Sequence, residues 1–191
     1  MLSDAMSDGG TASGPAGLSL DDLDVGEQVL VTVPHSKQTL DVLPQRAFQN
    51  LLVVSTGSGP AKIERSVERR GEDPRRVGVV PVLGSSVSYD GPLWVADRTS
   101  PSDFTGLSIR FSEAAKHLKA DTGWVCLDSL STLYMYSDAS SVYRLVQSLT
   151  ATLRDHEVTG VFRIAPGTVD GQTREQLRGL FDDTRTLMET G

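Results

Sequence analysis

The chain has 191 residues, of which 38% are hydrophobic and 6% aromatic, and this length suits one domain with a sizeable core. It contains no run of about 18 apolar residues, so we expect no membrane-spanning helix. The formal net charge of −7 argues against nonspecific binding to nucleic acid, because phosphate groups would meet a negative field.

Composition also suggests a cellular setting. Only four of the 18 basic residues are lysines, and Asp outnumbers Glu about two to one. An acidic, lysine-poor chain of this kind is typical of salt-adapted proteins. Cys126 is the single cysteine, which excludes an internal disulfide and a cysteine zinc site, and its apolar surroundings predict a buried thiol. The first residues lack the pattern of a secretory signal. We therefore expect a cytoplasmic protein.

The N-terminal segment, residues 1–24, contains few large apolar side chains. Such a segment buries too little surface to offset the entropy of ordering, so we expect it to be flexible, with disorder over residues 1–17. Residues 18–24 are the exception and predict a short helical lead-in. The folded domain is expected to span residues 25–191.

Strand and helix patterns alternate along the rest of the chain. The expected strands are residues 28–33, 50–55, 76–82, 92–96, 124–127 and 160–164, and the expected helices are residues 40–48, 60–71, 104–118, 139–156 and 173–188. Most strands are almost continuously apolar, as strands covered on both faces are. This alternation predicts an α/β fold, a three-layer α/β/α domain with a mainly parallel sheet.

The loop after the first strand, residues 34–39, is the first place to look for a ligand, because open parallel sheets bind ligands beyond the carboxyl ends of their strands. Lys37 stands where a phosphate loop has its lysine. Ser36, however, stands in place of a glycine, Gln38 in place of Ser or Thr, and Val31 in place of the first glycine. We favour an ordinary turn in which Thr39 caps the next helix.

Two further strand ends are informative. The turn after the second strand, residues 55–60, holds no carboxylate that could polarise an attacking water, and a flexible Gly-Ser turn leading into a helix accounts for it. The fifth strand ends on Asp128, and Ser129, Ser131 and Thr132 follow. Asp128 is either a ligand for Mg²⁺ or a carboxylate that caps the following turn.

The order and spacing of these segments resemble the RecA/KaiC-like ATPase superfamily, and most closely its short KaiC-like proteins from salt-loving archaea. The resemblance covers residues 25–188 and is carried by residues 50–55 with the charged helix that ends at Gly71, by residues 101–107, by residues 125–131 and by residues 160–170. The third of these is similar to the Walker B strand, with Asp128 as its acidic residue.

The resemblance implies a RecA-like P-loop NTPase topology, but active relatives carry a full phosphate loop and a pair of Glu residues after the second strand. Only Asp128 matches those requirements here. We therefore expect a noncatalytic pseudo-ATPase domain with no catalytic residues and no cofactor, acting in regulation or signalling through a protein partner or a homo-oligomer. The alternative is a residual ATP-binding protein or slow NTPase. Its degenerate nucleotide site would use Ser36, Lys37, Gln38 and Asp128, with Asp128 on Mg²⁺.

Overall fold

A computed structural model of the chain describes residues 19–187. One sheet of seven strands has the order β4-β3-β2-β5-β6-β1-β7, and each pair of neighbours is parallel. The strands are β1 (Gln28–Thr32), β2 (Leu51–Ser55), β3 (Val77–Pro81), β4 (Trp94–Val95), β5 (Trp124–Asp128), β6 (Thr159–Ile164) and β7 (Asp183–Thr186).

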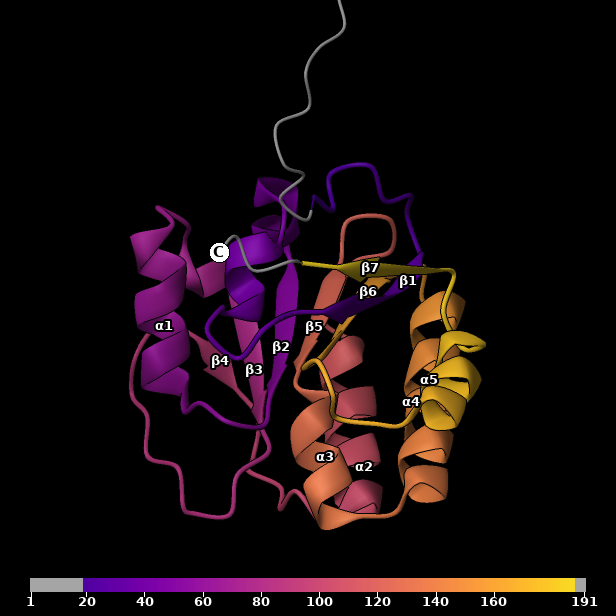
Figure 1. The fold of residues 1–191 in the computed structure, drawn as a ribbon. Helices are drawn as coiled ribbons and strands as arrows, with labels where there is room; N and C mark the ends of the chain where they lie inside the picture. Colours follow the sequence, from indigo (N-terminus) through magenta and orange to yellow (C-terminus); the bar gives the residue numbers. More distant parts are fainter. Residues whose placement is uncertain (1–18, 188–191) are drawn as a thin grey trace, which may run out of the picture.

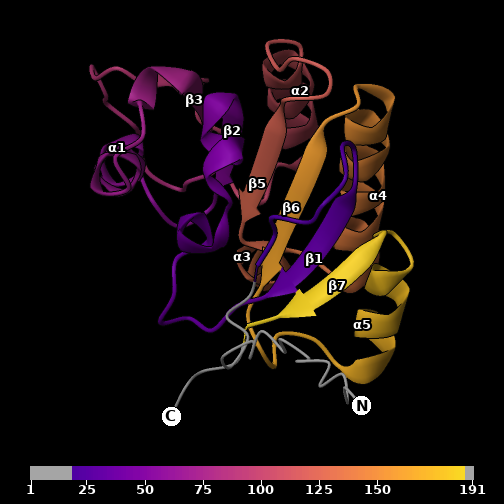
Figure 2. The ribbon, with the colours of Figure 1, turned by 90° about the horizontal axis from the view of Figure 1, so that it is seen from above.

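Helices cover both faces of this sheet (Figures 1 and 2). They are α1 (Pro60–Arg69), α2 (Phe104–Ala115), α3 (Leu130–Tyr136), α4 (Ala139–Asp155) and α5 (Gly171–Arg178), with 3-10 helices η1 (Thr39–Val42), η2 (Gln45–Gln49) and η3 (Pro74–Arg76). One face carries α1 with η1 and η2, and the other carries α2 to α5. Within residues 19–187, no helix is long and apolar enough to cross a membrane.

The central strands explain why their sequences are continuously apolar. In β2, Leu51 and Val53 belong to the core on the α1 face, whereas Leu52 and Val54 belong to the core on the α2 to α5 face. Successive side chains of a strand point to opposite faces, so a strand with helices on both sides needs apolar residues at every position. The predicted three-layer α/β/α fold with a parallel sheet is confirmed.

Three of the expected helices, α1, α2 and α4, begin at the expected residues. Pro60 occupies the first turn of α1, and Gly71 follows that helix with a φ of 73°. The carboxylates of Asp103 and Asp138 accept backbone N–H groups at the starts of α2 and α4.

The single helix expected over residues 173–188 is wrong within the described residues. The helix α5 ends at Arg178 with Gly179 as its C-cap, and the chain then forms strand β7 beside β1. Phe181 anchors this crossing by packing edge to face on Phe162. Without β7, strand β1 would be an exposed edge of the sheet. Pairing with β7 satisfies the N–H and C=O groups of β1, and a local helical pattern in the sequence carries no information about this pairing.

The helix expected over residues 40–48 is also wrong. Pro44 has no N–H group and disfavours a helical conformation of the residue before it, so Leu43 is extended and the segment divides into η1 and η2. Thr39 does not cap a helix either, because it is the first residue of η1 and its buried hydroxyl has no hydrogen-bond partner in the described structure. Conversely, the helix α3 has only two buried leucines, Leu130 and Leu133, and the sequence pattern did not predict it.

The folded part of the chain begins before residue 25. Residues 19–24 form a turn rather than the expected helical lead-in, and within it Leu20 and Leu23 are buried in the core on the α1 face. The Arg46 guanidinium donates to the carbonyl of Leu23 at 2.6 Å and so fixes this turn. The disorder expected over residues 1–17 lies outside the described residues.

Candidate functional site

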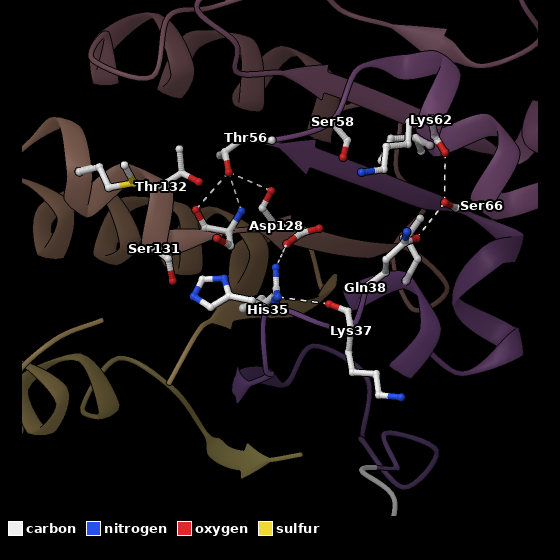
Figure 3. Close-up of a pocket in the computed structure, with 16 residues that line it drawn as sticks. His35, Lys37, Gln38, Thr56, Ser58, Lys62, Ser66, Asp128, Ser131 and Thr132 are labelled. Carbon is white, nitrogen blue, oxygen red and sulfur yellow. Dashed lines mark hydrogen bonds and ion pairs between the residues drawn. The ribbon is translucent and has the colours of Figure 1, made fainter. Parts of the chain in front are cut away.

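The candidate site is a pocket at the carboxyl ends of β1, β2 and β5, where parallel α/β sheets bind their ligands. Its volume is about 270 Å³. The lining residues come from the loops after β1 and β2, from η1, α1 and α3, and from β5 and β6 (Figure 3). The three strand ends singled out in the sequence therefore do meet at one place.

An ion pair forms the floor of this pocket. Arg163 of β6 donates from Nη1 to Oδ1 of Asp128 at 2.9 Å, and the exposed fractions of the two side chains are 11% and 25%. The partners are brought together because β5 and β6 are neighbouring parallel strands. In so little solvent the pair is a charge-assisted hydrogen bond rather than a solvated surface contact.

The same guanidinium also holds the loop after β1. Its Nη2 donates to the carbonyl oxygen of Pro34 at 3.0 Å and to that of Lys37 at 3.2 Å. These two carbonyls thus face the floor of the pocket. A loop that wraps a phosphate needs the opposite arrangement, with several backbone N–H groups converging on the anion.

Thr56, the first residue after β2, fixes the end of β5. Its hydroxyl accepts the N–H of Ser129 at 2.7 Å and lies 3.0 Å from the carbonyl oxygen of Asp128. The peptide bond between Asp128 and Ser129 is cis. Thr56 thus holds the peptide unit that follows Asp128, while Arg163 holds the Asp128 carboxylate.

One interpretation of the sequence made Asp128 the cap of the following turn. In the structure the Asp128 carboxylate bonds Arg163 instead. Ser129 is the N-cap of α3 and makes no side-chain capping bond. Its neighbour Ser131 turns instead toward β6, where its hydroxyl accepts the N–H of Ala165 at 2.8 Å and bonds the hydroxyl of Thr168 at 2.9 Å. The start of α3 is thus fastened to the end of β6 rather than to the Asp128 carboxylate.

The other three residues of the predicted nucleotide site are not brought together around Asp128. Lys37 lines the pocket, but its side chain extends away from Asp128 in Figure 3. The Gln38 side chain turns toward α1, where its Oε1 accepts the Ser66 hydroxyl at 2.9 Å. Ser36 does not line this pocket.

A metal ion would find few ligands here. Among residues 19–187 there is no group of three or more His, Cys, Asp or Glu side chains that could hold one, and Asp128 is the single carboxylate in the pocket lining. Mg²⁺ can bind through one carboxylate when a nucleotide supplies phosphate oxygens and water completes the shell. At Asp128, however, a guanidinium already occupies one carboxylate oxygen.

Sequence reasoning missed Arg163 and Thr56. A single charged residue between Phe162 and Ile164, inside an apolar strand, was the available signal for Arg163. Thr56 carried no signal, because a threonine in a Gly-Ser turn is ordinary. Cys126, in contrast, is fully buried as predicted, and burial raises the pKa of its thiol well above its ordinary value.

The family of unknown function DUF7504 matches residues 26–187 of the chain. The chain belongs to this family. The DUF7504 region runs from just before β1 to just after β7, so the pocket, Asp128 and Arg163 all lie inside it. No curated protein matches the chain.

Proposed function

We propose that this protein is a noncatalytic RecA/KaiC-like domain that acts in regulation or signalling through contacts with other proteins. The observation that carries the proposal is the placement of Arg163. Its guanidinium lies against the Asp128 carboxylate and draws two carbonyls of the loop after β1 inward. An internal cation thus fills the space next to the acidic residue at which an active relative would bind Mg²⁺.

The described loops of the pocket also offer little that would accelerate phosphoryl transfer. That reaction depends on positioning the phosphates and on stabilising the charge that develops on them. The loop after β1 offers carbonyls at the pocket floor, and the turn after β2 offers Thr56, Gly57 and Ser58 with no carboxylate to orient a water. The RecA-like topology itself is supported by the parallel sheet and by the meeting of these three strand ends.

A residual ATP-binding protein or slow NTPase is the second candidate. It is favoured by the presence of Lys37 and Asp128 in the lining of one pocket at the carboxyl end of the sheet. The pocket volume of about 270 Å³ weighs against it, since pockets for drug-sized ligands span roughly 300 to 1,000 Å³. A nucleotide would also have to displace Arg163 from Asp128.

Hydrolysis of ATP separates the noncatalytic domain from a slow NTPase. The purified protein is incubated with ATP and Mg²⁺ in low salt and in molar KCl, beside the Asp128→Asn variant. A noncatalytic domain gives the same phosphate release for both proteins, at the level of the buffer blank. Magnesium-dependent hydrolysis that Asp128→Asn abolishes would establish the enzyme instead.

The proposed setting is the cytoplasm of a salt-adapted archaeon. It is supported by the net charge of −7, the scarcity of lysine and the single cysteine. A homo-oligomer is part of the proposal, and nucleic acid is not an expected partner. Light scattering tests self-association.

Thermal unfolding tests salt adaptation. A salt-adapted acidic domain should melt at a higher temperature in molar KCl, and an unchanged or lower melting temperature would contradict that setting.

A further inference from the structure

The pocket concentrates positive charge in an otherwise acidic protein. The chain has four lysines and a net charge of −7, yet two of those lysines, Lys37 and Lys62, line this one pocket from different elements. The lining contains three cations, Lys37, Lys62 and Arg163, and one carboxylate, Asp128. Because Arg163 and Asp128 pair with each other, no carboxylate among the described lining residues compensates the Lys62 ammonium group, whereas the Lys37 side chain extends away from Asp128 (Figure 3).

Several hydrogen-bond donors in the walls of the pocket have no partner among residues 19–187. The Lys62 ammonium group, the hydroxyls of Ser58 and Thr132, and the amide nitrogen of Gln38 make no hydrogen bond to another residue of the described structure. Figure 3 shows the Lys62 side chain directed into the pocket on the side of Ser58. An ammonium group surrounded by hydroxyl and amide donors is chemically suited to an anion with several acceptor oxygens.

One exposed apolar side chain, that of Met135, belongs to the pocket lining. Met135 lines the pocket and is 81% exposed, and the next residue, Tyr136, is 53% exposed. Both lie at the end of α3, and Met135 contributes to the lining of the charged site. Exposed methionine and tyrosine side chains are typical of protein-binding surfaces, because a flexible thioether and an amphipathic ring adapt to a partner.

We propose that this pocket binds the carboxylate side chain of an acidic segment of a partner protein, with a neighbouring apolar side chain of that segment packed on Met135. The inference rests on the proposed noncatalytic function and names the chemistry of its partner. The positive charge of the pocket favours an acidic side chain, and the exposed Met135 favours a peptide with an apolar neighbour over a small free anion. The volume of about 270 Å³ accommodates one side chain.

Binding of defined peptides tests the inference. The probe is a fluorescein-labelled peptide of alternating Leu and Glu, and its Leu-Gln counterpart lacks only the charge. We expect anisotropy titrations to detect the Leu-Glu peptide and not the Leu-Gln peptide. Lys62→Gln and Met135→Ser should each weaken binding about tenfold, the effect of losing one good contact. Lys62 and Met135 are exposed, so neither change threatens folding.

The two lysines outside the pocket are the matched controls. Lys116→Gln and Lys119→Gln remove the same charge elsewhere and should leave the affinity unchanged. Equal weakening by these controls, or no binding of the Leu-Glu peptide, overturns the inference. Competition gives a further test. If Mg-ATP displaces the peptide at a concentration at which inorganic phosphate does not, the pocket is a nucleotide site and the inference is overturned. Parallel assays of ATP hydrolysis separate failure of this inference from failure of the proposed function.

Discussion

The guanidinium of Arg163 lies 2.9 Å from the carboxylate of Asp128 and also bonds two carbonyl oxygens of the loop after β1. One side chain thus joins β5, β6 and the loop after β1 at the carboxyl end of the sheet. The acidic residue that most resembles part of a nucleotide site is therefore engaged by the protein itself.

Removing this guanidinium should destabilise the fold. Arg163→Met keeps an unbranched apolar side chain, leaves the Asp128 carboxylate without its cation and removes one hydrogen-bond donor from the carbonyls of Pro34 and Lys37. We expect a loss of about 3 kcal/mol in the free energy of unfolding, measured with urea. Arg178→Met is the control, because its pair with Glu175 is solvent-exposed, and it should cost less than about 0.5 kcal/mol.

The coupling between the two charged residues can be measured separately. Asp128→Asn keeps an acceptor oxygen for Arg163, so we expect it to cost about 1 kcal/mol. In the double variant with Arg163→Met, the unpaired carboxylate is gone, and the combined loss should be smaller than the sum of the two single losses. Strict additivity in the same urea titrations would show that the pair contributes nothing.

A close contact between Gly160 and Gln28 makes the β1 end of the sheet sensitive to one methyl group. The Gln28 amide is fully buried and donates to the carbonyl of Val158 at 2.8 Å, and a Cβ at position 160 would collide with its oxygen. We expect Gly160→Ala to cost about 2 kcal/mol in urea unfolding. Gly171→Ala, where a Cβ meets open space, should be neutral, and a comparable loss there would refute the steric explanation.

The packed turn before residue 25 should contribute to stability. Leu23 is 3% exposed, whereas Val25, two residues later, is 52% exposed. Leu23→Ala should therefore cost about 3 kcal/mol, and Val25→Ala should change the unfolding free energy by less than about 0.5 kcal/mol. Thermal unfolding followed by circular dichroism checks both. Equal midpoints for the two variants would mean that the turn is not part of the cooperative unit.

The N-cap of α4 should make stability depend on pH. The pKa of Asp138 is lowered from its ordinary value of 3.8 to about 2, first because the Ser140 hydroxyl donates to its carboxylate and then because Ser141 donates from its N–H and hydroxyl. A lowered pKa stabilises the folded state above pH 3.8, and that contribution disappears as the pH falls toward 2.

Comparison with Asp138→Ala isolates this contribution. The melting temperature of the wild-type protein should exceed that of the variant at neutral pH, and the difference should shrink as the pH falls through this acidic range. A difference that stays constant down to the acid limit would contradict the capping explanation.

Local patterns were sufficient for most of the fold. Apolar runs such as Leu51 to Val54 identify strands buried on both faces, and Pro60 with Gly71 identifies the ends of a helix. The strand β7 could not be predicted in this way. Its residues are polar, and it forms because β1 needs a neighbour and Phe181 packs on a distant Phe162.

The location of the candidate site could be predicted from the sequence, but the contacts between its side chains could not. The sequence places Asp128 and the loop with Lys37 at the carboxyl ends of strands, and both line the pocket. It does not indicate that Arg163, 35 residues after Asp128, supplies the cation. The partners of a charged side chain depend on strand order, and strand order is a property of the whole sheet.

Binding of Mg-ATP is the most direct test of the proposed noncatalytic site. Thermal unfolding of the wild-type protein and of Asp128→Asn is followed with increasing Mg-ATP, at low salt and in molar KCl. A ligand at a hundred times its Kd stabilises a protein by about 2.7 kcal/mol. A site filled by Arg163 predicts no rise in melting temperature for either protein. A concentration-dependent rise that Asp128→Asn abolishes would contradict it.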